Sequence, residues 1–285
     1  MMFESIVIDD KLTLTDDEFE QISTLVYDHC GINLHDGKKE LVRSRLAKIL
    51  RQKRFRSFSQ YMDYVACDST GQAFSELIDS LSTNLTSFFR ESIHFEFLAG
   101  TFLPELIARK LRSNQLRLRG WSAGCSSGEE PYSIAITLLE ALPERSRWDA
   151  KLLATDISTR ILKRAQEGLY EQERIDPVPP ALKSRYLIRR TQKTGKRYEV
   201  APALRQMIVF KYLNLMENWP FRGPFDFIFC RNVMIYFDKP TQQRLIDRFW
   251  QTLAPGGILF TGHSESLTGI RHHFRYIQPT IYRKG

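Results

Sequence analysis

Residues 116–142 constrain the fold of this chain more than any other part of the sequence. Apolar and polar side chains alternate from Leu116 to Trp121, which predicts a strand, and residues 131–142 have the apolar spacing of an amphipathic helix. Residues 122–128 between them are nearly all small. A strand, a tight loop and a helix in this order are typical of an open α/β sheet, in which ligands bind where strands end and helices begin.

The loop lacks the glycine spacing of a dinucleotide site. Gly124 and Gly128 do not form the G-x-G-x-x-G pattern, and Glu129 and Glu130 stand where a pyrophosphate needs bare backbone N–H groups. Two carboxylates would repel a dinucleotide. They would attract a cationic nucleotide that carries an amino acid, such as S-adenosylmethionine, and this is the cofactor we expect.

Strands alternate with helices from residue 116 onward. We expect strands at residues 116–122, 151–155, 207–212, 225–230 and 257–261, and a terminal pair at 274–278 and 280–283. Helices are expected at 131–142, 158–167 and 240–253. The pattern favours an α/β fold with a seven-stranded, mostly parallel sheet and an antiparallel ending. Residues 186–200 resemble a basic hairpin that turns at Thr194-Gly195 and is inserted into this alternation.

The N-terminal part reads as a separate helical module. One helix should begin after Thr15, because Thr15-Asp-Asp-Glu18 has the form of a capping box. Further helices are expected at 38–53, 57–65 and 71–81. We therefore expect a helical domain at residues 1–88 and an α/β domain at residues 89–285.

Most of the net charge of +8 comes from residues 39–56, which hold eight basic residues and one acidic residue, Glu40. Val42, Leu46, Ile49 and Leu50 recur at helical spacing, so one face of this helix should pack and the rest is cationic. The cationic side is either a solvated helix face or a docking surface for an acidic protein or a nucleic acid.

The cysteines and the apolar runs exclude several classes of protein. Cys30, Cys67, Cys125 and Cys230 lack C-x-x-C spacing, which argues against a disulfide framework and a metal site. Only two of the six histidines are adjacent, so no cluster of His ligands is expected. No apolar run approaches the ~20 residues of a membrane span, and the N-terminus does not resemble a signal peptide. We expect a cytoplasmic protein that does not insert into a membrane.

Polar residues follow the apolar cores of two further strands. Asp156 ends the second strand, where a carboxylate can accept both ribose hydroxyls of an adenosine, although an Asp there can also be a cap or turn residue. Arg231 and Asn232 end the fourth strand, either as ligand contacts or as a structural turn. Tyr236 follows at a distance from which its hydroxyl can return to the cleft.

The segment Asn84-Leu-Thr-Ser-Phe-Phe-Arg90 surrounds two phenylalanines with an amide, a hydroxyl and a guanidinium. A guanidinium binds carboxylates bidentately, so Arg90 can hold the carboxylate of the cofactor or that of an acceptor. The structural alternative is an interdomain salt bridge.

Several motifs stand in order along the chain. They are Asn84-Leu-Thr-Ser-Phe-Phe-Arg90, Trp121-Ser-Ala, Ser127-Gly-Glu-Glu-Pro-Tyr-Ser133, Ala154-Thr-Asp156, Asn214-Leu215, Phe229-Cys-Arg-Asn-Val-Met-Ile-Tyr-Phe237 and Gly262-His-Ser-Glu265. Together they resemble the CheR family of chemotaxis receptor glutamate methyltransferases, over residues 13–283. The resemblance implies a helical N-terminal domain and a Rossmann-like methyltransferase domain with an antiparallel β-subdomain at about 185–206. It also implies the cofactor contacts Asn84, Thr86, Arg90, Glu129, Asp156, Asn214, Leu215, Asn232 and Val233.

By this resemblance the chain transfers a methyl group from S-adenosylmethionine to receptor glutamate carboxylates, leaving S-adenosylhomocysteine. Glutamate has a pKa of about 4.3, so the nucleophile is already ionised and no general base is required. Arg90 and Tyr236 are our candidates for positioning the acceptor. The expected partner is the cytoplasmic helical domain of a chemotaxis receptor, and whether a receptor C-terminal peptide binds the β-subdomain is open.

Two other functions are compatible with the same sequence features. A nucleic-acid methyltransferase would bind phosphates along residues 39–56, but only Phe55 accompanies the cations there, with Phe58 just beyond, so no nucleic acid is expected. A non-catalytic module would bind S-adenosylmethionine without turning it over.

Overall fold

The computed structural model describes residues 12–82, 84–192 and 195–285, and the chain divides into two compact units, residues 1–83 and 84–285. The division lies five residues before the boundary that the sequence suggested at residue 88. The reason is that the intervening residues pack with the second unit. Ser126 Oγ donates to the carbonyl oxygen of Asn84 (3.2 Å), and Phe88 lies in the second unit's core.

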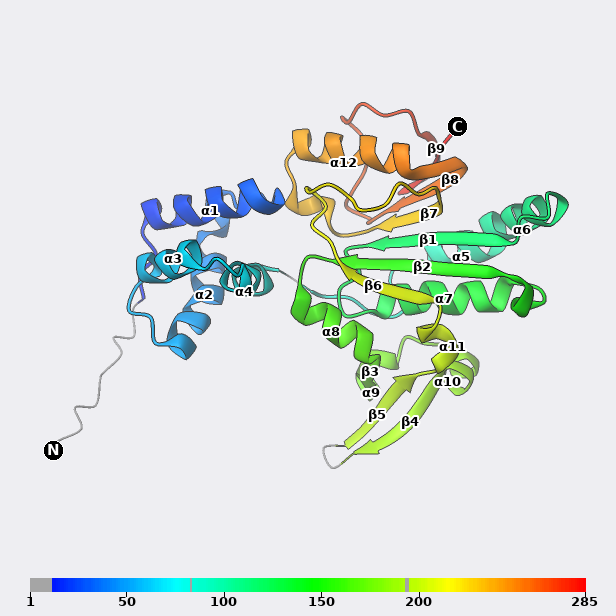
Figure 1. Ribbon diagram of the computed structural model, residues 1–285, viewed down its shortest axis with the longest axis horizontal. Helices are drawn as coiled ribbons and strands as arrows, with labels where there is room; N and C mark the ends of the chain where they lie inside the picture. Colours follow the sequence, from blue (N-terminus) through cyan, green and yellow to red (C-terminus); the bar gives the residue numbers. More distant parts are fainter. Residues whose placement is uncertain (1–11, 83, 193–194) are drawn as a thin grey trace. The chain divides into compact units, whose positions relative to one another are not determined.

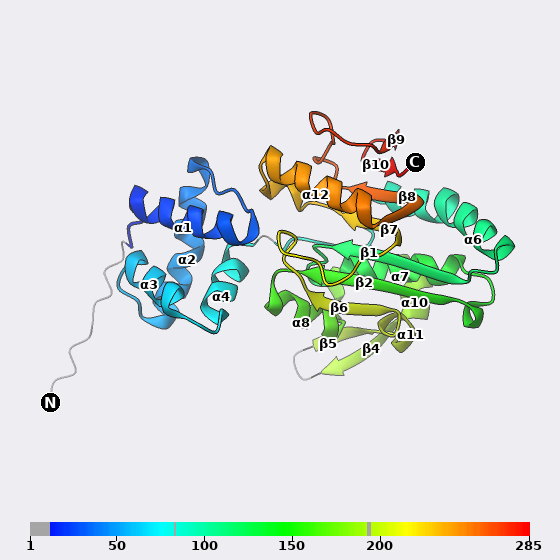
Figure 2. The same ribbon diagram turned by 45° about the horizontal axis from the view of Figure 1, so that its top comes forward.

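The first unit consists of helices (Figure 2). Their buried side chains are mostly apolar. The helices are α1 (Asp16–Cys30), α2 (Lys39–Lys53), α3 (Phe58–Cys67) and α4 (Gln72–Leu81), with the 3₁₀ turn η1 (Asp36–Lys38) before α2. The capping box is confirmed, because Glu18 N donates to Thr15 Oγ1 at 3.2 Å and Thr15 N donates to Glu18 Oε2 at 2.9 Å. Val42, Leu46 and Leu50 are fully buried, so α2 packs through the apolar face that the sequence predicted.

The second unit is built on a seven-stranded sheet with the order β6-β2-β1-β7-β8-β10-β9 (Figure 1). The strands are β1 (Arg117–Ala123), β2 (Asp149–Asp156), β6 (Ile208–Tyr212), β7 (Phe225–Cys230), β8 (Leu253–Thr261), β9 (Arg275–Gln278) and β10 (Ile281–Arg283). The first five pair in parallel, and β10 runs antiparallel to both β8 and β9. The predicted α/β sheet with an antiparallel ending is confirmed.

The side chains of the central strands alternate between two apolar layers. In β7, Phe227 and Phe229 join one core cluster, whereas Ile228 and Cys230 join the other. Both faces of the sheet are therefore covered, and every residue of β7 is buried.

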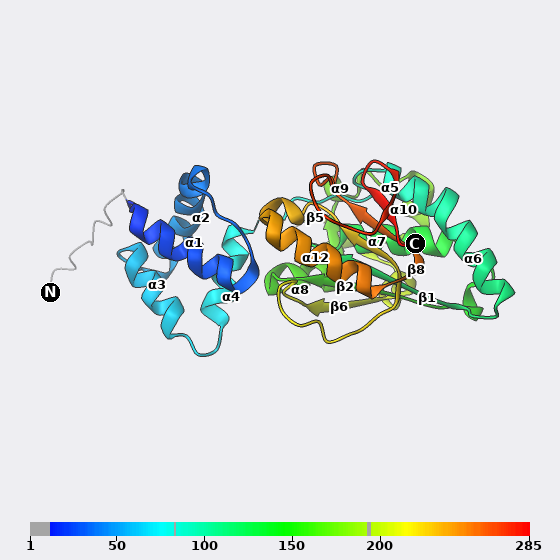
Figure 3. The same ribbon diagram turned by 90° about the horizontal axis from the view of Figure 1, so that it is seen from above.

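Helices cover the two faces. One face carries α5 (Ile93–Phe97), the π-helical turn η2 (Leu98–Phe102), α6 (Leu103–Arg112) and α7 (Glu129–Ala141), which lie next to one another (Figure 3). The other face packs against α12 (Lys239–Thr252), and α8 (Thr159–Glu167) follows β2. The sequence did not predict α5, η2 or α6. No helix within the described ranges is long and apolar enough to cross a membrane.

A second, antiparallel sheet has the order β3-β5-β4. The hairpin strands β4 (Leu187–Gln192) and β5 (Gly195–Val200) were expected, and part of the expected turn, Thr194, lies outside the described residues. The third strand, β3 (Leu169–Glu171), comes from before the segment 185–206 that the resemblance implied. Three residues are too few to show a periodic pattern. The connecting helices are α9 (Gln172–Ile175), α10 (Pro180–Tyr186) and α11 (Pro202–Arg205).

Candidate functional site

The carboxyl ends of five parallel strands bring the candidate residues to one edge of the sheet. Ala123 at the end of β1 pairs with Thr155 of β2, and Cys230 at the end of β7 pairs with Thr261 of β8. The loops that follow these strands, together with residues 213–217 after β6, therefore share this edge. Ligands of open α/β sheets bind at such an edge.

The first loop, residues 122–128, is shaped by two glycines in the left-handed region. Gly124 has φ 82°, and a Cβ there would lie 2.3 Å from Val233 Cγ2, so this loop is in contact with the loop after β7. Gly128 has φ 98° and precedes α7 directly. Gly124 allows the contact between the two loops, and Gly128 allows the turn into α7. Neither glycine is needed for the approach of a pyrophosphate, which agrees with the absence of the dinucleotide pattern.

Glu129 and Glu130 have different partners. Glu129 is fully buried, accepts a hydrogen bond from Ser127 Oγ (2.6 Å) and forms an ion pair with Arg174. Glu130 accepts from Ser122 Oγ (2.7 Å) and lies 3.4 Å from Arg231 Nη1. Burial raises the pKa of Glu130, and Arg231 opposes that shift.

Nothing in the sequence indicated that Arg174 would be the partner of Glu129, since 45 residues separate them. A cofactor contact from Glu129 stays a prediction, and it requires Arg174 to share the carboxylate. Glu130, which had no assigned role, links the first strand to Arg231.

Asp156 holds the backbone of two loops. Its Oδ2 accepts from the N–H of Ser126 (2.8 Å) and its Oδ1 from the N–H of Ser158 (2.9 Å). A carboxylate offers about four acceptor sites, so an Asp in this position can act as a turn residue and also bind a ribose. The two interpretations of Asp156 are therefore compatible.

The segment 84–91 has a constrained backbone. Phe89 and Glu91, on either side of Arg90, have φ values of 53° and 58°. Residues other than glycine adopt this left-handed backbone conformation only at a cost in free energy. The Arg90 side chain donates to the Leu85 carbonyl oxygen (2.7 Å), and Phe89 N donates to Ser133 Oγ (3.0 Å). Asn84 and Thr86 are half-buried in the same segment.

Arg231 ties this segment to the sheet. Its buried guanidinium donates to the carbonyl oxygen of Arg90 and lies 3.1 Å from Glu91 Oε2, with Glu130 on its other side. Arg231 therefore has a structural role other than the expected turn, since it holds segment 84–91, and its contacts lie directly beside Arg90.

The loop after β7 is held by a buried carboxylate that the sequence analysis left without a role. Glu265 accepts from the N–H groups of Asn232 (2.7 Å), Ile235 (3.1 Å) and Gly262 (2.6 Å). Burial raises the pKa of Glu265 despite these bonds. Asn232 has φ 58°, and Tyr236 is half-buried at the end of the same loop.

Asn214 and Leu215 lie in the loop after β6. The Asn214 side chain accepts from Met216 N (3.0 Å) and donates to Glu217 Oε1 (3.2 Å), so it stabilises a turn. The carbonyl oxygen of Leu215 accepts from Arg248 and from Trp219 Nε1. Only the resemblance to a known family pointed to these two residues.

The fold also gathers two histidines that the sequence separates. His94 Nδ1 lies 3.5 Å and His263 Nε2 3.9 Å from Glu91 Oε2, and the possible ligand atoms of the three residues lie within 4.8 Å of one another. We had expected no such cluster. Arg231, 3.1 Å from the same oxygen, supplies the positive charge that balances Glu91. Burial lowers the pKa of His94 to about 3, so His94 is neutral near pH 7 and its contact with Glu91 is not an ion pair.

The sheet order β6-β2-β1-β7-β8 is the 3-2-1-4-5 order of a doubly wound nucleotide-binding fold. Its carboxyl edge offers carboxylates, amides and guanidiniums, which suit a cationic amino-acid-bearing nucleotide. Fold and site together define a methyltransferase that uses S-adenosylmethionine.

Comparison with known proteins specifies the family. A family model described as the SAM binding domain of CheR methyltransferase matches residues 84–283, and one described as its all-alpha domain matches residues 17–82. The chemotaxis protein methyltransferase of Borreliella burgdorferi is 44% identical over 276 residues, which cover 96% of each chain. Chemotaxis protein methyltransferase 2 of Pseudomonas aeruginosa is 42% identical, and the match covers 94% of this chain and 93% of the relative. The chemotaxis protein methyltransferase of Escherichia coli is 40% identical, and the match covers 96% of this chain and 92% of the relative. The chain belongs to the CheR methyltransferase family.

Proposed function

We propose that this protein methylates glutamate side chains of chemotaxis receptors, using S-adenosylmethionine. The observation that carries the proposal is that both units match the two domains of one methyltransferase family, and that relatives named chemotaxis protein methyltransferase align over almost the whole chain. A receptor's cytoplasmic helical domain is the proposed substrate, and the cytoplasm is the proposed place of action.

The proposed cofactor contacts come from segment 84–91 and from the ends of, or the loops after, β1, β2, β6 and β7. They are Asn84, Thr86, Arg90, Glu129, Asp156, Asn214, Leu215, Asn232 and Val233. When bound, S-adenosylmethionine supplies an electrophilic methyl group. The residues of the chain bind it, orient the acceptor carboxylate and exclude water from that carboxylate.

Arg90 and Tyr236 are proposed to position the acceptor. The carboxylate of a glutamate is ionised at neutral pH, so neither residue has to remove a proton. Arg90 supplies positive charge, and its backbone is fixed by Arg231. We propose Arg231 as a positioning residue, because it touches the carbonyl group of Arg90 and the carboxylate of the next residue.

Docking of the receptor is proposed for the basic surface of α2 and of the residues after it up to Arg56. Lys39, Arg43 and Lys53 are already paired with acidic residues of the same unit. Lys48, Arg54 and Arg56 are exposed and form no ion pair within the described residues. An acidic helical surface would be attracted to these free cations.

The small sheet offers a second docking place. In the order β3-β5-β4, strand β4 lies at an edge, so a receptor C-terminal peptide can add to it as a further strand. Ile188 of β4 is an exposed apolar side chain that such a peptide can cover.

The test is to incubate the protein with labelled S-adenosylmethionine and either receptor cytoplasmic fragments or RNA. Mild alkali then releases methanol only from a carboxyl methyl ester. We expect alkali-labile label on the receptor fragments, and much less with Tyr236→Phe at equal cofactor saturation. Alkali-stable label on RNA, or cofactor binding without transfer to either, would contradict the proposal.

A further inference from the structure

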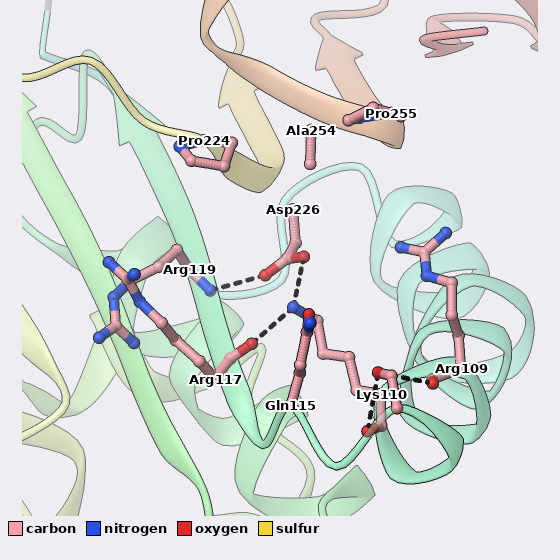
Figure 4. A pocket seen from close by; sticks show the side chains of 10 residues that line it. Arg109, Lys110, Gln115, Arg117, Arg119, Pro224, Asp226, Ala254 and Pro255 are labelled. Carbon is pink, nitrogen blue, oxygen red and sulfur yellow. Dashed lines mark hydrogen bonds and ion pairs between the residues drawn. The ribbon is translucent and has the colours of Figure 1, made fainter.

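A cavity of about 560 Å³ opens at the opposite edge of the large sheet (Figure 4). It lies between the end of α6, the first residues of β1 and β7, and the start of β8. These strands are parallel, so the cavity is at their amino ends. β1 has 7 residues, which at about 3.3 Å each separate the two edges by roughly 20 Å. The cavity is therefore distinct from the candidate cofactor site.

The lining of the cavity carries an excess of positive charge. Its charged side chains are Arg109, Lys110, Arg117, Arg119 and Asp226. Asp226 lies 2.8 Å from Lys110 Nζ and accepts from the Arg119 backbone N–H at 2.8 Å, so its charge is already balanced. The Arg119 side chain pairs with Asp149.

The two other cationic residues of the lining are Arg109 and Arg117. Neither forms an ion pair with any residue that the structure describes, and both are exposed. In Figure 4 the Arg109 guanidinium stands on one side of Asp226, and Arg117 on the other side together with Arg119. Arg117 lies in the field of the Asp149 carboxylate, which Arg119 also neutralises, so positive charge remains in the lining for an anionic ligand.

The rest of the lining is apolar or neutral. Pro224, Ala254 and Pro255 form the side opposite Lys110 and Gln115 (Figure 4). An apolar wall facing cationic side chains fits a molecule that has both a phosphate and a flat or aliphatic body. The volume lies within the range of about 300–1,000 Å³ that is typical of small-molecule sites.

We propose that this cavity binds a phosphorylated small molecule of about the size of a nucleoside monophosphate. The Arg109 guanidinium contacts the phosphate, Arg117 adds positive charge on the other side of the cavity, and the two prolines pack against the body of the ligand. The site is independent of methyl transfer, since none of its residues belongs to the carboxyl edge.

The experiment uses the full chain saturated with S-adenosylhomocysteine, so that the cofactor site cannot take up the probe. Titration calorimetry with guanosine monophosphate at low salt should show saturable binding with one site. Guanosine, which lacks the phosphate, should bind at least tenfold more weakly.

Two variants test the location. Arg109→Gln combined with Arg117→Gln should weaken binding about tenfold or more, and Ala254→Phe should abolish it by filling the cavity. Arg112→Gln is the matched control, because Arg112 is an exposed cation of the same helix that does not line the cavity. The double arginine variant, Ala254→Phe and Arg112→Gln should all retain methyl transfer. A failure of the proposed binding site is therefore distinguishable from a failure of the proposed function.

Several outcomes would overturn the proposal. They are the absence of saturable binding, equal affinity for guanosine, or an equal loss with Arg112→Gln. Displacement of the nucleotide by a short poly-glutamate peptide of equal affinity would assign the cavity to an acidic protein segment instead.

Discussion

At the scale of single residues, Asp156 joins the ends of two strands to the place proposed for the cofactor. Replacing it with Ala removes the acceptor for the N–H groups of Ser126 and Ser158 as well as the proposed ribose contact. We expect Asp156→Ala to weaken S-adenosylmethionine binding at least tenfold, which equilibrium titration can measure. Asp149→Ala, at the other end of the same strand, is the control. Unchanged affinity in the Asp156 variant would remove it from the proposed site.

His94 gives a prediction about pH. Its pKa in the folded chain is about 3, and an unfolded chain has the ordinary value near 6.5. Between these values the unfolded chain binds more protons, so the contribution of His94 to stability is complete above pH 6.5 and is lost as the pH falls. From pH 6.5 to 4 the loss should be about 3 kcal/mol.

The measurement compares the pH dependence of urea unfolding for the protein and for His94→Phe. Buried Glu130 and Glu265 have raised pKa values and act in the opposite direction, so only the difference between the two proteins isolates His94. The variant should be less stable at pH 7, because it loses the contact with Thr280 Oγ1, and its stability should fall less on acidification. Parallel curves for the two proteins would show that His94 does not titrate in this range.

At the scale of elements, Arg231 connects segment 84–91 to the end of β7. Arg231→Gln leaves Glu91 and Glu130 without their cation, and breaking a buried pair of this kind costs about 3–5 kcal/mol. We expect the melting temperature to fall and turnover to fall more than cofactor affinity. Arg231→Lys should restore part of the turnover. If Arg231→Gln lowers the stability but leaves the turnover of each folded molecule unchanged, Arg231 has only a structural role.

The first loop can be tested through two glycines. Gly124→Ala must adopt φ 82° and also places a Cβ 2.3 Å from Val233, whereas Gly269→Ala must adopt φ 78° in open space. The backbone cost is about 1 kcal/mol in each. Gly124→Ala should therefore destabilise the protein more than Gly269→Ala and should also weaken cofactor binding. Equal effects of the two substitutions in thermal and binding measurements would refute the close contact between loops.

At the scale of the whole molecule, the helical unit is proposed to recruit the receptor and the α/β unit to carry out the transfer. Lys48→Glu with Arg56→Glu reverses two exposed charges of the first unit. Receptor methylation at low salt should fall several-fold, with cofactor affinity unchanged, and the difference should shrink as salt screens the attraction. Arg112→Glu, which changes the charge of the second unit, is the control. If methylation does not depend on the charges of Lys48 and Arg56, this basic surface is only a solvated one.

The parts of the fold that the sequence predicted are those with a local signal. β7 has the bounds that its run of apolar residues indicated, and α1 begins at its capping box. The segment from α5 to α6 was missed because its π-helical turn interrupts the helical period, and β3 because it is only three residues long. Local patterns could not reveal either one.

By itself, the sequence determined the α/β class, the polar residues at the strand ends and the unsuitability of the first loop for a dinucleotide. These properties depend on which residues stand next to one another in the chain. Only the tertiary structure decided the partners: Arg174 for Glu129, Arg231 for Glu91 and Glu130, and Glu265 for the loop at Asn232. A buried charge requires a counter-charge or hydrogen-bond donors, but any segment that the fold brings near can supply them. The identity of the partner is therefore fixed by packing and not by position in the sequence.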